Sequence, residues 1–144
     1  MSELAFHTGI DDRFKYACLA MRKAQKLKMS AAVLLETEDD LRRFDNALWS
    51  FESTAFIPHG VPGTADMQRG GIALATSPDK LPSSDLLVLL SHGAPRNIKT
   101  LLERFPKIID VVGKVDPELT EGRKRFVEYK RQGIEPKVVK RPGT

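Results

Sequence analysis

The stretch AAVLLETEDDLRRFDNALW, residues 31 to 49, decides the fold class. Residues 31–35 form a short apolar run, which predicts a strand that is buried on both faces. Thr37 has the side chain of a helix N-cap, and Asp40 places a carboxylate in the first turn. The helix that follows has apolar residues at spacings of three and four: Leu41, Phe44 and Leu48. A buried strand leading directly into an amphipathic helix is the repeating unit of an α/β sheet.

The same alternation of apolar runs and amphipathic segments extends along the rest of the chain. It predicts further strands at residues 4–8, 71–76, 86–90 and 108–112, and further helices at residues 11–28, 95–105 and 117–132. Residues 58–71 contain two prolines and four glycines, which predicts an irregular connection. We therefore expect one α/β domain over residues 1–144, with three layers: a mostly parallel central sheet and helices on both faces.

Composition narrows the class of protein. The 144 residues are 41% hydrophobic and 29% charged, which is ordinary for a soluble globular chain. Cys18 is the one cysteine, so no disulfide can form within the chain, and a cytoplasmic location is expected. The longest apolar run, residues 86–90, is far shorter than the roughly 20 residues of a membrane helix, so we expect no membrane association.

The sequence shows no assembled catalytic chemistry. After the first strand, HTGIDD (residues 7–12) has one glycine and two carboxylates, where a phosphate-binding loop needs several glycines. His7, His59 and His92 are far apart and form no helical metal pair. His92 follows a strand and is the best enzymatic candidate, although a hydrogen-bonded loop histidine is the simpler interpretation. We expect no catalytic residues, no cofactor and no metal.

The positive charge is concentrated near the C-terminus. GRKRFVEYKRQG, residues 122–133, places five cationic side chains around Phe126 and Tyr129. From Gly122 onward there are eight Lys/Arg and two Glu, whereas the 121 preceding residues carry 15 basic and 17 acidic groups. A local cationic surface indicates an anionic partner at this segment, either nucleic acid or an acidic polypeptide.

On a helix, this segment separates into faces. At about 100° per residue, one stripe contains Leu119, Gly122, Phe126 and Tyr129. Arg123 and Lys130 follow one edge of the stripe, and Arg125 lies on its other side. In one interpretation, the rings pack on the sheet and the cations are solvated. In the other, a partly exposed ring beside Arg123 forms a pocket for an apolar and anionic ligand, because an arginine can bind a carboxylate bidentately.

Three further patterns stand out together: DNALWSFESTAFIPHG (residues 45–60), IIDVV (residues 108–112) and the terminal GRKRFVEYKRQG. In this combination they resemble the chi subunit family of the bacterial DNA polymerase III holoenzyme. An Asp-x-x-Leu-Trp block followed by Phe-x-Pro-His, with a late Arg-x-Arg-aromatic-x-x-Tyr before a glycine, is a specific combination. Length and element order extend the resemblance over essentially the whole chain. It implies a nucleotide-binding-like α/β fold and an accessory replication protein without enzymatic activity.

The resemblance also implies partners and a site. Proteins of this family bind the acidic, apolar C-terminal tail of single-stranded-DNA-binding protein and link it, through the psi subunit or another clamp-loader subunit, to the clamp loader, so that contact with DNA is indirect. The implied pocket has Arg123 as a carboxylate clamp and Phe126 as an apolar wall, with Trp49, Val112 and Gly133 also contributing. Lys130 is added from the helical wheel. Phe126 stands where the family often has Tyr, so a phenolic hydroxyl is absent.

Two other functions remain open at this point. The basic segment would also suit direct binding of single-stranded nucleic acid, with a steep salt dependence. A small-molecule enzyme using His92 at the strand ends is the third hypothesis.

Overall fold

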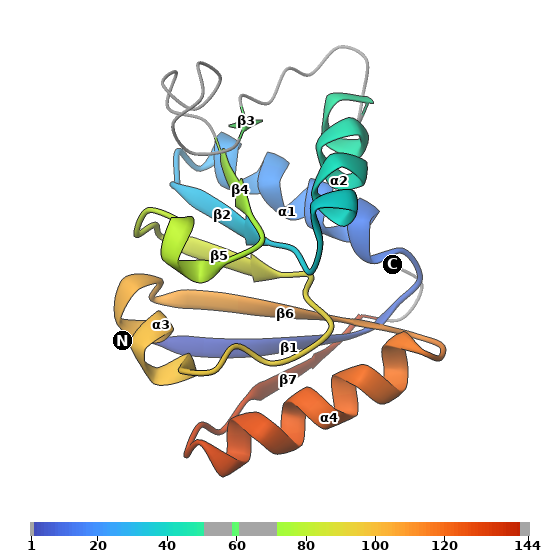
Figure 1. Ribbon diagram of the computed structural model, residues 1–144, viewed down its shortest axis with the longest axis vertical. Helices are drawn as coiled ribbons and strands as arrows, with labels where there is room; N and C mark the ends of the chain where they lie inside the picture. The colour runs from blue at the N-terminus through green and yellow to red at the C-terminus, as the bar shows by residue number, and fades with distance from the viewer. Residues whose placement is uncertain (1, 51–58, 61–71, 142–144) are drawn as a thin grey trace.

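A seven-stranded sheet forms the centre of the computed structural model, which describes residues 2–50, 59–60 and 72–141 (Figure 1). The strand order is β3-β4-β2-β5-β6-β1-β7, and every neighbouring pair is parallel. The strands are β1 (Glu3–Ile10), β2 (Ala31–Leu34), β3 (His59–Gly60), β4 (Ile72–Ala75), β5 (Leu86–Leu89), β6 (Lys107–Gly113) and β7 (Lys137–Lys140). The helices are α1 (Arg13–Lys26), α2 (Glu38–Ser50), α3 (Ile98–Arg104) and α4 (Glu118–Arg131), with a short 3₁₀ turn, η2 (Pro78–Lys80).

The helices form two layers, one on each face of the sheet. The core on one face joins Met21 of α1 and Phe44 of α2 to inward residues of the strands. The core on the other face joins Leu101 of α3 and Tyr129 of α4 to the alternate residues of the same strands. Figure 1 shows α4 running beside β7 and β1 at one end of the sheet. The three-layer α/β prediction is confirmed.

The predicted elements recur with shifted ends. The helix expected from residue 95 begins at Ile98, because the side chain of Asn97 accepts the backbone N–H of Thr100 and forms the N-cap. The prediction of an irregular segment at residues 58–71 missed β3, and the rest of that segment lies outside the described residues. β7 was not predicted at all, since its residues are largely exposed and form no apolar run. No helix in the described part of the chain is long and apolar enough to span a bilayer.

A buried ion pair fastens α4 to the sheet. Arg125, 2% exposed, donates from Nε and Nη2 to the carboxylate of Asp110 in β6, with closest distances of 2.9 Å. The hydroxyl of Tyr129 donates to the same carboxylate at 2.6 Å. Arg125 also donates from Nη1 to the carbonyl of His92, which follows β5. The helical wheel placed Arg125 on the side of the stripe opposite Arg123, and the interpretation that the cations are solvated is wrong for Arg125, because Asp110 holds its guanidinium in the core.

Protonation of this cluster follows from its surroundings. Burial, followed by the charge of Asp110, raises the pKa of Tyr129 far above its ordinary value. Burial alone would lower the pKa of Arg125, but the charge of Asp110 and the hydrogen bonds to it raise that pKa instead. The cluster is therefore a charged Arg–Asp pair with a neutral tyrosine that satisfies a further lone pair.

Breaking the pair should be costly. We expect Asp110→Asn to lower the free energy of unfolding by about 3–5 kcal/mol, because it leaves a buried guanidinium without its counter-charge. Chemical denaturation followed by circular dichroism measures the loss. Arg131→Gln is the matched control, since it breaks an exposed pair with Glu128 and should cost less than about 1 kcal/mol. Equal, small losses in the two variants would contradict a structural role for the buried pair.

Candidate functional site: a hollow beside α4

An open hollow of about 380 Å³ lies between α4 and the end of the sheet. We call it the α4 hollow. Four of its residues come from α4 and four from strands β1, β6 and β7: Phe6, Thr8, Val112, Leu119, Arg123, Phe126, Val127 and Val138. Arg123 is the charged member of this lining, and apolar side chains make up most of the rest. The surface is thus apolar with a cation in its lining.

A close approach of α4 to β6 sets the depth of the hollow. A methyl group at Gly122 would lie 2.4 Å from Cγ1 of Val112, so only a residue without a side chain lets the helix rest on this valine. Phe6 of β1 pairs in register with Val138 of β7, and both line the hollow. Gly122 therefore allows the α4 residues of the hollow to lie close to its strand residues.

Phe126 is a half-buried wall of the hollow. Its ring packs edge-on against Phe6, with centroids 5.3 Å apart. Nζ of Lys130 lies 5.7 Å from the centroid of the Phe126 ring, in cation–π range. Tyr129, the other aromatic residue of the segment, is 0% exposed and belongs to the core. One ring of the segment therefore remains available to a ligand.

Arg123 is exposed and makes no salt bridge within the described residues, although the pKa of the nearby Asp116 carboxyl is lowered by hydrogen bonds from Thr120 and, to a smaller extent, by the charge of Arg123. Among the residues that the structure describes, no carboxylate lies within salt-bridge distance of its guanidinium, in contrast to Arg125 and Arg131, which pair with Asp110 and Glu128. Two parallel N–H groups of such an arginine can bind both oxygens of a carboxylate. Arg123 and Phe126 line the same hollow, so a ligand can occupy both at once.

The sequence-based site residues do not all meet here. Val112, Arg123 and Phe126 line the hollow, and Lys130 contacts it through the Phe126 ring. Gly133 follows the end of α4 with φ +87°, a conformation suited to glycine, and its N–H donates to the carbonyl of Lys130. Trp49 is 44% exposed on α2, which covers the opposite face of the sheet. Its predicted place near the pocket is therefore wrong, because the crossover from β2 carries α2 away from α4.

Sequence reasoning identified Val112 but missed the other three strand residues of the hollow. Phe6 and Thr8 were placed on a strand but assigned no role, and Val138 lies on the unpredicted β7. The available signal was the pattern of KVVK, residues 137–140, which is short and bounded by charges. Such a pattern is typical of an edge strand.

His92 and Cys18 form no catalytic arrangement in the described part of the chain. The His92 side chain is about half exposed, with its ring nitrogens 4.0 Å and 3.9 Å from carboxylate oxygens of Asp40 and Glu121. Burial raises the pKa of the Cys18 thiol to about 12, which keeps it protonated. No group of three or more histidine, cysteine or acidic side chains among the described residues is arranged to hold a metal ion.

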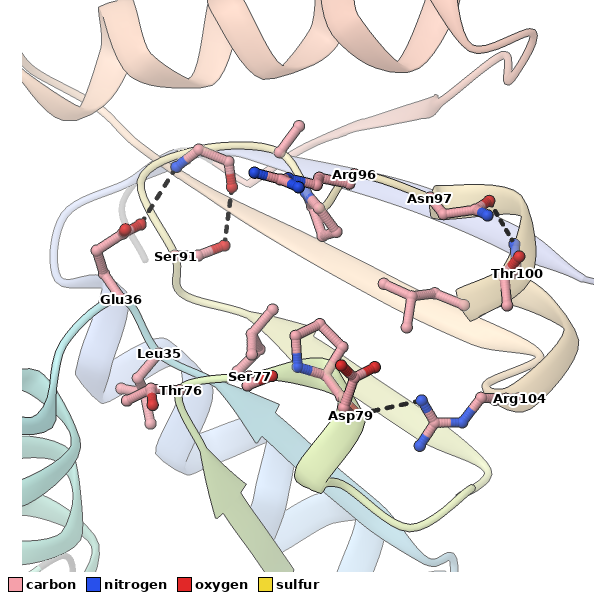
Figure 2. A pocket seen from close by; sticks show the side chains of 16 residues that line it. Leu35, Glu36, Thr76, Ser77, Asp79, Ser91, Arg96, Asn97, Thr100 and Arg104 are labelled. Atoms are coloured by element: carbon pink, nitrogen blue, oxygen red, sulfur yellow. Dashed lines mark hydrogen bonds between the residues drawn. The ribbon is translucent and has the colours of Figure 1, made fainter.

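A second hollow, of about 530 Å³, lies at the carboxyl ends of β2, β4 and β5 (Figure 2). In α/β folds this edge is where nucleotides commonly bind, on backbone N–H groups of the loops. Here the carboxylate of Glu36 accepts the N–H groups of His92, at 2.7 Å, and of Gly93, at 3.4 Å. Arg104 turns toward η2 and donates to the carbonyls of Pro78 and Leu81. The protein's own groups therefore already engage these two loop N–H groups and Arg104, whereas Arg96, which also lines this hollow, pairs with no carboxylate among the described residues.

These features define a three-layer α/β protein that has no glycine-rich phosphate loop in the described part of the chain and has a hollow with a cationic lining residue beside α4, near the β7 edge of the sheet. The family model described as "DNA polymerase III chi subunit, HolC" matches residues 1–137, and the chain belongs to this family.

Three curated relatives are each named DNA polymerase III subunit chi. The Haemophilus influenzae protein is 29% identical over 68% of this chain and 66% of its own length. The Pseudomonas aeruginosa protein is 26% identical over 84% and 81%. The Escherichia coli protein is 27% identical over 77% and 75%.

The contact of Gly122 with Val112 can be tested by a double-mutant cycle. We expect Gly122→Ala to destabilise the protein by about 1–3 kcal/mol, because the new methyl group forces α4 off β6. The cost should be smaller in a Val112→Ala background, where the clashing methyl groups are gone. Lys124→Ala, at an exposed position of the same helix, is the control and should be nearly neutral. An undiminished cost in the Val112→Ala background would contradict the contact.

His7 predicts a pH dependence of stability. It is half-buried on β1, with Nδ1 2.5 Å from the Tyr16 hydroxyl, and burial together with the nearby charges of Arg141 and Lys107 lowers its pKa from 6.5 to about 4. Between these two pH values the unfolded state binds more protons, so the contribution of His7 to stability falls as the pH drops. As the pH is lowered from 6.5 to about 4, denaturation curves should show a smaller loss of unfolding free energy for His7→Gln than for the wild type. Parallel losses would contradict the prediction.

Proposed function

We propose that this protein binds the acidic C-terminal tail of single-stranded-DNA-binding protein in the α4 hollow. In this role it is a non-enzymatic accessory subunit of DNA polymerase III, which links the tail to the clamp loader through the psi subunit or another clamp-loader subunit. Its association with DNA is then indirect. The observation that carries the proposal is that Arg123, Phe126 and Val112 line one hollow in a member of the chi family.

The hollow suits the end of a polypeptide. Arg123 would bind the terminal carboxylate bidentately, while the apolar side chain of the last residue packs against Phe126 and Val112. A volume of about 380 Å³ is near the lower end of the range for ligand pockets, roughly 300–1,000 Å³. It fits one or two side chains, which is the scale of a tail.

A contact of this size predicts modest affinity. It buries far less surface than the roughly 1,200–2,000 Å² of a standard stable interface, so a dissociation constant in the micromolar range is expected. Because Arg123 is exposed, added salt should weaken the contact. Phe126 has no hydroxyl group, so its ring can offer a bound ligand apolar contact but no hydrogen bond.

The small number of exposed aromatic rings in residues 122–133 favours a peptide ligand over single-stranded DNA. Binding of single strands relies on exposed rings on which successive bases stack. Of the two rings in this segment, Tyr129 is fully buried and Phe126 is half-covered by Phe6. Arg125 is also buried and cannot contact a phosphate backbone. The segment therefore presents a single ring beside its exposed charges.

Arg123→Ala tests the proposal. Titration calorimetry with a synthetic peptide that has acidic residues and ends in an apolar residue should show binding weakened at least about tenfold, because the terminal carboxylate loses its bidentate partner. Arg131→Ala is the matched control: it removes the same charge from the same helix, but at a side chain already paired with Glu128. Its affinity should stay within about twofold of wild type.

Unchanged affinity in Arg123→Ala, with wild-type circular dichroism, would remove the site assignment. A parallel anisotropy titration with a bare oligonucleotide addresses the nucleic-acid hypothesis. Tight binding of the oligonucleotide with a steep salt slope, and no binding of the peptide, would replace the proposed function with direct DNA binding.

A further inference from the structure

β7 presents alternate residues to the two faces of the sheet. Side chains alternate along a strand, so Val138 and Lys140 share one face, and Lys137 and Val139 share the other. Val138 lines the α4 hollow. Lys140 pairs in register with Thr8, which also lines the hollow. Lys140 therefore extends from β7 on the side of the hollow.

The lysines around the hollow differ in whether a carboxylate already lies near them. Lys137 extends on the opposite face, where its Nζ lies 3.6 Å from the carboxylate of Glu3. Lys130 contacts the Phe126 ring and also lies 3.9 Å from the carboxylate of Glu135. Within the described ranges, Lys140 is exposed and has no carboxylate within 4 Å of its Nζ. It shares this property with Arg123.

We infer that Lys140 is the second cationic contact of the α4 hollow, binding an acidic side chain that precedes the terminal residue of the bound tail. This inference rests on the proposed function. It assigns the end of the tail to Arg123 on α4 and the acidic part to Lys140 on β7. The tail would thus cross the hollow from strand to helix.

Strand spacing sets an approximate position for the acidic residue of the tail. Val112, Thr8 and Lys140 belong to the adjacent strands β6, β1 and β7, and two strand intervals span roughly 10 Å. An extended chain advances about 3.3 Å per residue. The carboxylate bound by Lys140 therefore belongs to a residue about three positions before the terminal one.

The test uses the full chain and two peptides. Both end in the same apolar residue, and one has Asp where the other has Asn, three positions before the end. We expect Lys140→Gln to weaken binding of the Asp peptide by about two- to fivefold, the range of an exposed ion pair, and to leave binding of the Asn peptide unchanged. Lys137→Gln is the matched control, since it removes the same charge from the same strand on the opposite face. It should affect neither peptide.

A charge-reversal variant provides a second, independent test of the role of Lys140. Lys140→Glu should lose most affinity for the Asp peptide and regain affinity for a peptide with Lys at that position. Equal effects of Lys140→Gln and Lys137→Gln, or equal effects on the Asp and Asn peptides, would overturn the role of Lys140 while leaving the proposed function intact. Failure of the wild type to bind any of the peptides would overturn the proposed function, and the inference with it.

Discussion

The buried pair of Asp110 and Arg125 is the constraint on which the site depends. It fixes the rotation of α4, because the guanidinium must reach a carboxylate at the centre of β6. At about 100° per residue, the α4 residues that line the hollow then fall between about 100° and 200° around the helix from Arg125. Gly122 fixes the remaining variable, the distance of the helix from the sheet. The rotation of α4 and its distance from the sheet together place Arg123 and Phe126 beside the residues of β1, β6 and β7 that line the hollow.

The central part of the fold could be predicted because its signals are local. Buried runs such as residues 86–90 and apolar spacings such as Leu41, Phe44 and Leu48 identify strands and helices directly. β7 has no such signal, because it is stabilised by pairing with β1 on one side and remains largely exposed. Val138 of β7 lines the hollow, so the sequence alone could predict only part of the site.

The burial of Arg125 and the position of Trp49 depend on contacts between distant segments. The helical wheel cannot distinguish a buried arginine from a solvated one, because the partner of Arg125 lies 15 residues away in β6. A charged residue in the middle of the apolar run IIDVV was the available sign that a buried cation was required. Trp49 was assigned to the pocket from a motif contiguous in sequence, whereas proximity depends on which face of the sheet a crossover takes.

The two hollows differ in which polar groups remain available to a ligand. At the carboxyl edge, Glu36 satisfies two loop N–H groups and backbone carbonyls hold Arg104, so these donors suited to phosphate are already engaged, although Arg96 in the same lining pairs with no described carboxylate. At the flank, Arg123 and Lys140 have no such partner in the described part of the chain. What distinguishes the α4 hollow is that its exposed Arg123 lies beside an apolar surface. A ligand that fits there must combine negative charge with an apolar group, and the end of an acidic polypeptide does so where a phosphate does not.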